Sequence, residues 1–389
     1  MKPKLLIFIN TLHFGGAERV VSQLLNHLND DFELHLALYS NIINYSISNK
    51  VKVFDLKENV NAGNITTLLR IPLIARRLSG YCKKNNIQTS VSFLNRPCYA
   101  NAIMKKFWGY KGRTIMCERS HQSSILNYIG GGSSLYKLIT KKLIAFSYQQ
   151  SDLVIANSKL SKADLQENFG VSAPIKVIYN PIDIKALEEK AAEMFPDFFE
   201  HDIFYFITTG NFRVEKNFSL LIKAFSHLKQ LPVKLIFVGG GALETELKNQ
   251  VQQLGIAEKV IFTGFKKNPF KYMNGSDCFV LSSLTEGFPN VLLEALACGK
   301  PVISTDCKSG PRELLAPNTS IEQQATNDYE IADYGLLTPA NNALALAKAM
   351  KRMYEDKFLQ KSFASKAKAR AAAFDVNIIK EYFIDAFSA

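Results

Sequence analysis

Short apolar runs alternate with segments of helical periodicity along most of the chain. Several of the runs, such as LLIFI, FYFI and LIFV, are apolar almost throughout. Strands of this kind are covered by helices on both faces, which is typical of parallel sheets. Between the runs, apolar residues such as Phe218, Leu221 and Phe225 recur on one helical stripe. The alternation of strand and helix predicts an α/β protein with right-handed crossovers.

The strand pattern occurs twice along the chain. In the first half we expect strands at 5–10, 33–39, 51–54, 89–94, 114–117, 152–157 and 176–179. In the second half we expect them at 203–209, 234–238, 259–263, 278–281, 301–305 and 335–337. With 389 residues and roughly 150 residues per domain, the chain is long enough for two cores.

A break near residues 180–181 separates the two halves. It precedes an acidic helix expected at 184–194. A basic helical tail at 348–373 precedes a last helix at 376–387, in which apolar residues recur. We therefore expect a first domain at 1–182 and a second at 183–374.

The composition excludes several classes of protein. A hydrophobic content of 47% excludes a wholly disordered chain. No apolar run approaches the roughly 20 residues that a membrane-spanning helix needs. The apolar stretch at 5–9 is too short for a signal-peptide core. Six cysteines form no C-x-x-C pair, so we expect reduced thiols and a cytoplasmic protein.

Basic residues are concentrated in the first half. Residues 1–185 carry 24 Lys and Arg against 11 Asp and Glu, whereas the rest carries 23 against 24. The basic residues are densest at 105–142, where they interleave with aromatic ones. Such a surface can bind an anionic membrane leaflet, with a contribution of about 1 kcal/mol per basic residue. A merely solubilising surface is the alternative, and no motif indicates nucleic acid.

The segment LSSLTEGFPNVLLEALACGKPVIST at 281–305 carries the most informative candidate residues. A strand ends near Leu281, Glu286 lies in the loop that follows, and Pro289 fits the first turn of a helix. Glu294 lies about one turn inside that helix, so the two carboxylates would contact different parts of one extended ligand. The unpaired N–H groups of the helix start suit an anion or sugar hydroxyls.

Two further loops follow predicted strands, where parallel sheets bind ligands. Arg213 and Lys216 lie in GNFRVEKN at 210–217. Such cations can hold a diphosphate and neutralise the charge that builds up as it leaves. A helix-start salt bridge with Glu215 is the alternative. Gly15 and Gly16 follow the first strand, and their N–H groups can meet a phosphate.

Several motifs are absent from the sequence. It contains no D-x-D pair, which would hold a divalent metal on a nucleotide diphosphate, and no P-loop. The histidines show no metal-ligand spacing. We therefore expect neither a metal nor a cofactor.

The combination resembles a known family. EGFPNVLLE at 286–294, followed by ALACGKPVIST, resembles the E-x7-E signature of the retaining glycosyltransferases of family 4, which have the GT-B fold. GGAE, GNFRVEKN, FVGGG, VIFTGF and YGLLTP resemble other landmarks of that family in their order and spacing. The resemblance implies two Rossmann-like, doubly wound domains that face each other across a cleft. Residues 375–389 would cross back as a helix that completes the first domain.

The resemblance also implies a role for each site residue. Glu286 would contact the donor sugar at the reaction centre, and Arg213 and Lys216 would bind its diphosphate. Glu294 would accept hydrogen bonds from the ribose, and Gly16 would approach the diphosphate from the other domain. The remaining donor-binding residues would be Gly287, Phe288, Pro289 and Asn290 around the sugar or distal phosphate, and Gly264 and Phe265 near the base. On the acceptor side the resemblance implies Gly15 and either Arg119 or His121.

Two positions depart from the family pattern. An arginine commonly follows the glycine of the G-R-x-x-x-x-K landmark, but here Asn211 follows Gly210 and the arginine is Arg213. A histidine often follows the strand matching 114–117, whereas this chain reads Glu118, Arg119, Ser120, His121. The E-R pair resembles members that extend lipid-linked glycans in bacterial surface polysaccharide or glycoprotein assembly.

The resemblance thus implies a retaining, metal-independent transferase. The expected donor is UDP-hexose or UDP-N-acetylhexosamine, with GDP-mannose as the alternative. The expected acceptor is a glycan, borne on a membrane lipid such as a polyprenyl diphosphate. The protein would lie peripherally on the cytoplasmic face of the inner membrane. Competing readings are an inverting GT-B transferase or sugar-nucleotide epimerase, a nonenzymatic glycan- or lipid-binding module, and a nicotinamide dehydrogenase, which would need a dinucleotide fingerprint.

Overall fold

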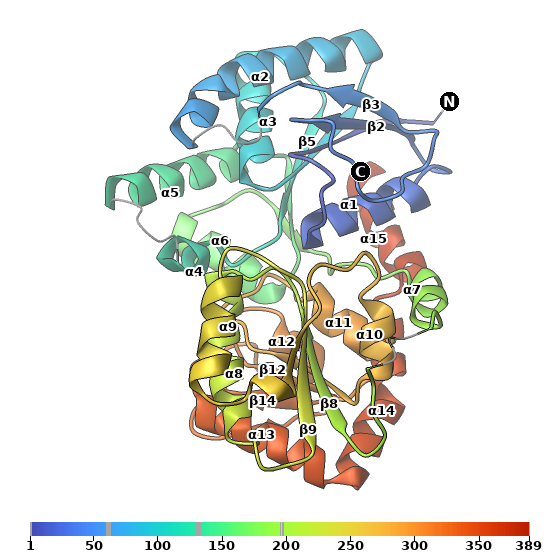
Figure 1. Ribbon diagram of the computed structural model, residues 1–389. Coiled ribbons are helices and arrows are strands. Elements are labelled where there is room, and N and C mark those ends of the chain that lie inside the picture. The colour runs from blue at the N-terminus through green and yellow to red at the C-terminus, as the bar shows by residue number, and fades with distance from the viewer. Residues whose placement is uncertain (1, 60–63, 129–133, 195, 197, 389) are drawn as a thin grey trace. The chain divides into compact units, whose positions relative to one another are not determined.

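The computed structural model describes residues 2–59, 64–128, 134–194, 196 and 198–388. The chain divides into two compact units (Figure 1). The first comprises Met1–Pro181 and Val376–Ala389, and the second comprises Ile182–Asp375. The chain therefore leaves the first unit once and returns to it for its last helix.

The first unit is built on a parallel sheet of seven strands in the order β3-β2-β1-β4-β5-β6-β7. The strands are β1 (Lys4–Ile9), β2 (Glu33–Leu38), β3 (Lys52–Asp55), β4 (Thr89–Phe93), β5 (Arg113–Glu118), β6 (Leu153–Ala156) and β7 (Ile175–Val177). The strands predicted for this half are confirmed, with ends that shift by one or two residues. The apolar side chains of β1, β2, β4, β5 and β6 are buried on both faces, as the continuous apolar runs indicated, whereas those of the edge strands β3 and β7 are partly exposed.

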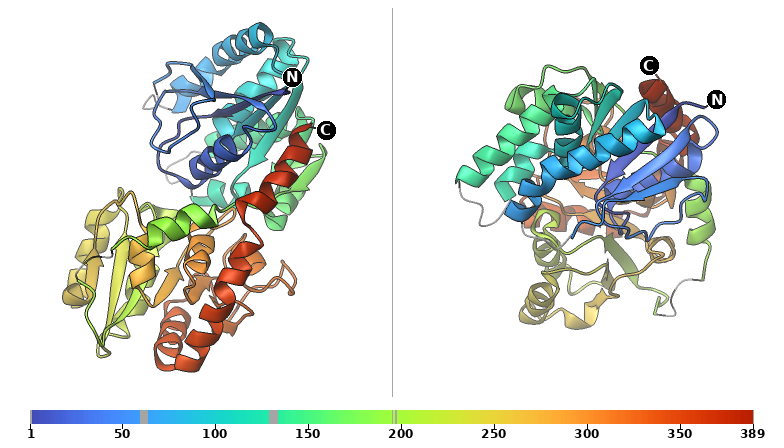
Figure 2. Two further views of the ribbon diagram at one scale, coloured as in Figure 1. Left: turned by 90° about the vertical axis from the view of Figure 1, so that its right-hand side faces the viewer. Right: turned by 90° about the horizontal axis from the view of Figure 1, so that it is seen from above.

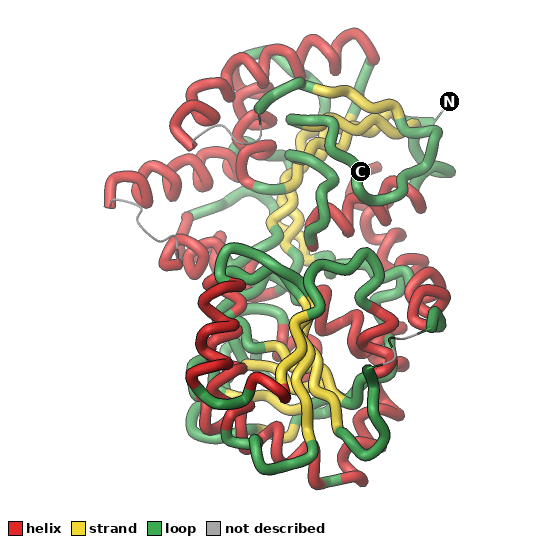
Figure 3. Tube along the Cα trace, in the orientation of Figure 1, coloured by secondary structure: helices red, strands yellow, loops and turns green. Residues whose placement is uncertain are grey.

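Helices cover both faces of this sheet (Figure 3). They are α1 (Gly16–His27), α2 (Asn64–Asn85), α3 (Asn95–Phe107), α4 (Gln122–Tyr128), α5 (Ser134–Gln149), α6 (Lys159–Phe169) and α15 (Val376–Ser388). Helices α2, α3, α5 and α6 share one hydrophobic cluster with the sheet. On the α1 side, α15 packs against α1, and Figure 2 shows its red ribbon within the first unit. The guanidinium of Arg113 donates to the carbonyl of Ala386 at 2.6 Å and fixes this helix.

The second unit repeats the plan with the strand order β10-β9-β8-β11-β12-β14-β13. Its strands are β8 (Phe204–Thr209), β9 (Val233–Val238), β10 (Val260–Phe262), β11 (Cys278–Leu281), β12 (Val302–Thr305), β13 (Glu330–Ile331) and β14 (Leu336–Thr338). The strands predicted for this half are confirmed. The short β13 was not predicted, and it runs antiparallel to β14. It lacks an apolar run, and the Arg312 guanidinium fixes it by pairing with Glu330 at 2.7 Å.

The helices of the second unit again lie on both faces of the sheet. They are α7 (Ile184–Ala191), α8 (Phe218–Ser226), α9 (Glu244–Gln253), α10 (Phe270–Gly275), α11 (Asn290–Ala297), α12 (Pro311–Leu315), α13 (Ala343–Glu355) and α14 (Lys357–Ala372), with 3-10 turns η1 (Val214–Lys216) and η2 (Ala257–Lys259). Helices α8, α9 and α13 share a hydrophobic cluster with one face. None of the helices in the described ranges has the length and apolar character to cross a bilayer.

Two helix predictions are wrong in their extent. The basic tail at 348–373 is not one helix, because Asp356 separates α13 from α14. Its carboxylate accepts a hydrogen bond from the N–H of Leu359 at 2.9 Å and so caps the start of α14. The acidic helix predicted to reach residue 194 ends at Ala191.

Both sheets reverse their strand order at an equivalent place. In the first unit the reversal lies between β1 and β4, and in the second it lies between β8 and β11. Loops that leave neighbouring strands in opposite directions open a crevice at the carboxyl edge, where α/β proteins bind ligands. We therefore expect ligand-binding residues in the loops after these four strands.

Candidate functional site

The loops after β8 and β11 bring two predicted site residues into contact. Lys216 Nζ lies 2.6 Å from Glu286 Oε1, and the side chains are 22% and 11% exposed. The hydroxyl of Ser283 donates to the same carboxylate oxygen at 2.6 Å. The carboxylate is therefore fixed by two hydrogen bonds, and the ammonium lies where the second sheet reverses its order. Ser283 was not predicted, although it stands three residues before Glu286 in the same loop.

The backbone holds the two loops together. The hydroxyl of Ser282 donates to the carbonyl of Lys216 at 2.9 Å. The N–H of Leu284 donates to the carbonyl of Glu215 at 2.8 Å. These hydrogen bonds join the two loops independently of the charges. The relative position of the loops therefore does not depend on the ion pair alone.

A third loop, which follows β12, also holds the backbone of Glu286 in place. The N–H of Glu286 donates to the carbonyl of Lys308 at 2.9 Å. Gly310 has a φ of +95°, and a Cβ there would lie 2.6 Å from Pro289 Cδ and 3.1 Å from the Gly287 carbonyl oxygen. Only glycine fits this close approach. The loop that carries Glu286 is consequently confined between its neighbours.

Glu294 lies on α11 and is 3% exposed. The helix begins at Asn290, and Pro289 is its N-cap rather than a residue of its first turn, which corrects the prediction. The side chain of Phe288 is buried and its ring centroid lies 5.4 Å from that of Phe374. Phe288 can therefore meet a ligand only through its backbone, as can Gly287. The roles assigned to these residues stay predictions.

Arg213 lies apart from the buried ion pair. Its side chain is 66% exposed, and its guanidinium lies 4.0 Å from the carboxylate of Glu215. This is the helix-start salt bridge that the sequence left open, and it is a loose one. Lys216 takes Glu286 as its partner instead. The two cations of the loop thus differ in burial and in the strength of their pairing.

The loop after β10 contains the pair expected near the base. Gly264 has a φ of +70°, and its carbonyl accepts a hydrogen bond from the N–H of Gly239 at 3.1 Å. Phe265 is 53% exposed, and its role near the base stays a prediction. The glycines after β9 serve packing, because a Cβ on Gly239 would lie 2.0 Å from the carbonyl oxygen of Gly210.

In the first unit, the loop after β1 leads into α1. Gly15 is the N-cap of this helix, and its N–H donates to the hydroxyl of Tyr45 at 3.3 Å. Gly16 is the first helical residue. A Cβ on Gly15 would lie 2.2 Å from the carboxylate of Glu18, so this turn is closely packed. Tyr45 was not predicted as part of this turn.

Arg119 and His121 follow β5 and have different surroundings. The guanidinium of Arg119 lies 4.8 Å from the ring centroid of Phe93 and donates to Asn180 Oδ1 at 2.9 Å. Burial lowers the pKa of Arg119. His121 is 6% exposed and its Nδ1 lies 2.9 Å from the hydroxyl of Ser124. Both side chains are thus fixed by the first unit, and the acceptor-side role of either one stays a prediction.

The buried carboxylate of Glu118 organises this segment. It accepts hydrogen bonds from the N–H of Arg119 at 2.7 Å and the N–H of Ser120 at 2.8 Å. The Gln122 amide and the Tyr148 hydroxyl each donate to it at 2.8 Å. Glu118 therefore fixes the backbone of Arg119 and Ser120, the two residues that follow it.

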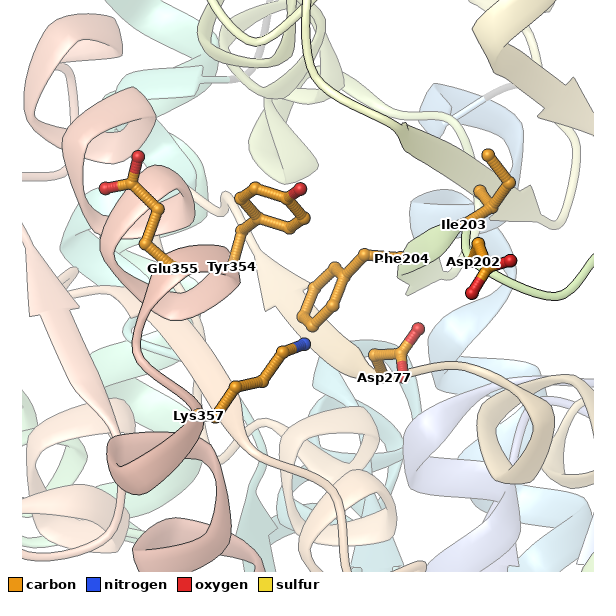
Figure 4. Close-up of a pocket in the computed structure, with 7 residues that line it drawn as sticks. All are labelled: Asp202, Ile203, Phe204, Asp277, Tyr354, Glu355 and Lys357. Atoms are coloured by element: carbon orange, nitrogen blue, oxygen red, sulfur yellow. The ribbon is translucent and has the colours of Figure 1, made fainter.

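The described part of the chain holds no group of three or more His, Cys, Asp or Glu side chains arranged to bind a metal ion. A pocket of about 470 Å³ lies at the amino ends of β8 and β11 (Figure 4). It is lined by Asp202, Ile203, Phe204, Asp277, Tyr354, Glu355 and Lys357. This is the opposite edge of the sheet from the Lys216–Glu286 pair, and the Lys357 ammonium already lies 5.2 Å from the Phe204 ring centroid.

The fold matches solved structures along its whole length. HepE of Anabaena, solved in complex with UDP, has a TM-score of 0.75, 21% identity and 99% coverage of both chains. Sucrose-phosphate synthase from Thermosynechococcus elongatus has a TM-score of 0.83, 17% identity and coverage of 100% of this chain and 98% of that one. With its two Rossmann-like sheets, the chain has the GT-B fold of glycosyltransferases.

Sequence comparison identifies the family. Residues 14–186 match the model "Glycosyltransferase Family 4", and residues 189–370 match "Glycosyl transferases group 1". A Campylobacter jejuni protein is 37% identical over 373 residues, with 96% of each chain covered. It is the N-acetylgalactosamine-N,N'-diacetylbacillosaminyl-diphospho-undecaprenol 4-alpha-N-acetylgalactosaminyltransferase. A second Campylobacter jejuni enzyme, an alpha-1,4-N-acetyl-D-galactosaminyltransferase, is 27% identical and covers 98% of this chain and 97% of its own length. The chain belongs to glycosyltransferase family 4.

Proposed function

We propose that the protein is a retaining, metal-independent glycosyltransferase that moves a sugar from a nucleotide diphosphate sugar to a hydroxyl of a lipid-linked glycan. The observation that carries this proposal is the contact of Lys216 with Glu286 at the point where the second sheet reverses its order. It holds a cation for the leaving diphosphate and a carboxylate for the sugar at one place. Membership of family 4 supports the same assignment.

In the proposed reaction, the acceptor hydroxyl oxygen bonds to the anomeric carbon while the bond to the diphosphate breaks. The bonding electron pair leaves with the diphosphate, and the hydroxyl proton passes to a departing phosphate oxygen. Attack on the same face as the leaving group retains the configuration. Lys216 stabilises the charge that develops on the diphosphate, and Arg213 contributes from the surface. Glu286 stabilises the positive charge at the anomeric centre.

Metal independence is part of the proposal. The N-terminus of α8 begins two residues after Lys216, and the helix dipole adds partial positive charge beside the ammonium. Together with Arg213, these groups supply the charge neutralisation that Mg²⁺ gives to a nucleotide diphosphate in other enzymes.

For the donor we propose UDP-hexose or UDP-N-acetylhexosamine, and for the acceptor a polyprenyl-diphosphate-linked glycan. The UDP in the HepE structure supports the nucleotide. The names of the two Campylobacter relatives support an N-acetylhexosamine and a diphospho-undecaprenol glycan. They also specify α linkages, and a sugar transferred from an α-linked UDP donor with retention gives an α product.

NMR of the product tests this assignment. The protein is incubated with UDP-N-acetylgalactosamine and an undecaprenyl-diphosphate glycan, and the anomeric coupling of the new linkage is measured. We expect an α linkage. A β linkage from the α donor would contradict retention, and no transfer from any of a panel of nucleotide sugars would contradict the enzymatic function.

We further propose that the first unit docks peripherally on an anionic membrane, on its cytoplasmic face. The first half of α5 combines exposed apolar and basic residues: Leu135, Leu138 and Ile139 are 64%, 50% and 44% exposed, and Lys141 and Lys142 are exposed beside them. The helix carries no acidic residue. Not every aromatic residue of this region contributes, because Tyr110 is buried and its hydroxyl donates to the Ile87 carbonyl.

Liposome flotation tests this docking. We expect the protein to float with vesicles that contain anionic lipid and to remain in solution with neutral ones. The triple substitution of Leu135, Leu138 and Ile139 by glutamine should abolish flotation. Leu344→Gln on α13, where the leucine is 56% exposed, is the matched control. Equal binding to neutral and anionic vesicles would contradict the proposal.

A further inference from the structure

Two polar groups at the carboxyl edge of the first sheet lack partners among the described residues. Tyr39 directly follows β2 and is 3% exposed, and its hydroxyl oxygen has no hydrogen-bond partner. Asn10 directly follows β1, and its Oδ1 is likewise buried without a partner. Because buried polar groups in folded proteins are nearly always paired, two such groups at the ends of adjacent strands require an explanation.

The two residues are neighbours in the fold. The N–H of Tyr39 donates to the carbonyl of Asn10 at 2.9 Å, which extends the pairing of β1 with β2 by one step. The ring of Tyr39 stacks on that of Phe8 with centroids 5.3 Å apart, so it belongs to the face covered by α2 and α3. The stacking fixes the ring, and the hydroxyl plays no part in it.

This edge is where the first sheet reverses its order. Helix α3 begins there at Asn95, next to β1, without an acidic residue in its first turn. The positive charge of Arg96 acts on Tyr39, although burial has the larger effect and raises the pKa of the phenol. Asn10, Asn95 and Arg96 are each only half-buried, so the rim of this edge is open to solvent.

We propose that Tyr39 and Asn10 form a carbohydrate subsite that binds the acceptor glycan. The inference rests on the proposed function. The chemistry of the pair selects the ligand: an amide oxygen only accepts hydrogen bonds, whereas a phenol both donates and accepts. A sugar hydroxyl or an acetamido N–H satisfies both groups. A phosphate offers only acceptors and would leave Asn10 unpaired, so the subsite binds sugar and not the lipid diphosphate.

Tyr39→Phe is the test, because it removes only the hydroxyl. We expect the acceptor KM to rise about 10-fold with kcat and the donor KM unchanged, as for an interaction made equally in ground and transition states. The melting temperature should stay equal or rise, because the folded protein loses a buried group that had no partner. Wild-type and variant are compared with UDP-N-acetylgalactosamine and an undecaprenyl-diphosphate glycan, and acceptor binding without donor gives a second readout.

Tyr110→Phe is the matched control. Tyr110 is also buried, at 5% exposure, but its hydroxyl donates to the carbonyl of Ile87 at 3.2 Å. This variant should melt at a lower temperature and keep the wild-type acceptor KM. An unchanged acceptor KM in Tyr39→Phe would overturn the subsite and assign the hydroxyl to an ordered water. A rise in the donor KM would overturn it in favour of the donor. Failure of the wild-type enzyme to transfer sugar would instead contradict the proposed function.

Discussion

The two sheets reverse their strand order at equivalent places, but the residues at those two places differ in charge and in hydrogen bonding. In the second unit the reversal carries a cation and a carboxylate in contact, and the Ser282 hydroxyl and the Leu284 N–H join the two loops through hydrogen bonds to backbone carbonyls. In the first unit the equivalent edge carries a phenol and an amide oxygen that find no partner in the described part of the chain. The Lys216–Glu286 pair is charged and its members bind each other, whereas Tyr39 and Asn10 are neutral and their side-chain oxygens have no partner among the described residues.

The difference follows from what each edge would have to bind. A leaving diphosphate gains negative charge during the reaction, so a charge held in advance lowers the barrier. An acceptor glycan changes its charge little, and neutral hydrogen-bonding groups are sufficient to orient it. The same type of sheet can thus stabilise the leaving diphosphate where one sheet reverses its strand order and position the acceptor where the other does.

The strongest way to break this comparison is Lys216→Ala. Removing one such stabilising group typically lowers kcat about 10²–10³-fold. The fold should persist, since the loops remain joined through Ser282 and Leu284. The control is Lys368→Ala, which removes an exposed ammonium that pairs with Glu188 at 2.8 Å. Near-normal turnover of Lys216→Ala would remove this residue from the mechanism.

Glu294→Gln has the next largest expected effect. The change keeps the shape of a buried side chain but would weaken the charge-assisted hydrogen bond that we predict between Glu294 and the ribose. We expect the donor KM to rise about 10-fold while the acceptor KM is unchanged. Steady-state kinetics with each substrate varied in turn measures this. An effect on the acceptor KM alone would contradict the assignment of this edge to the donor.

Arg213→Ala should have a smaller effect than Lys216→Ala. Its side chain is 66% exposed and only loosely paired, so solvent screens its charge. We expect kcat to fall a few-fold, with a steeper loss at low ionic strength than at high. Arg352→Ala, an exposed arginine that pairs with Asp356 at 2.7 Å, is the control. A loss as large as that of Lys216→Ala would mean that the loop closes over the diphosphate.

Metal removal should have the smallest effect. If the cations and the helix start of the second unit suffice, excess EDTA leaves the initial rate within about two-fold of the rate with Mg²⁺. The rate is measured by release of UDP after the protein has been dialysed against chelator. A rate that collapses in EDTA and recovers on addition of Mg²⁺ would contradict metal-independent transfer.

Most of the fold could be predicted because buried parallel strands leave a strong local signal. The runs LLIFI in β1, FYFI in β8 and LIFV in β9 are apolar almost throughout, and the helices between the strands are amphipathic. The strand β13 and the break at Asp356 escaped prediction for a physical reason. An ion pair to Arg312 fixes the strand, and a side-chain cap starts a new helix at the break. Neither has a hydrophobic period.

The candidate site was less predictable than the fold. The loops that carry Lys216 and Glu286 could be found from glycines, charges and the order of elements. That the two side chains touch depends on β8 and β11 being neighbours, which strand order along the chain does not reveal. The support from Ser283 is a matter of loop conformation. That the side-chain oxygens of Tyr39 and Asn10 lack hydrogen-bond partners among the described residues is still harder to predict. A sequence shows which residues are polar but not which ones find a partner.

The return of α15 to the first unit imposes an order on folding. Phe383 and Phe387 are buried in that unit, and Phe387 packs edge-on against Phe32 with ring centroids 6.3 Å apart. During synthesis, residues 182–375 leave the ribosome before this helix does. The first unit must therefore wait, with the surface beneath α15 uncovered, until the second unit has been translated. Nascent chains that stall before residue 376 would expose this surface to chaperones and proteases.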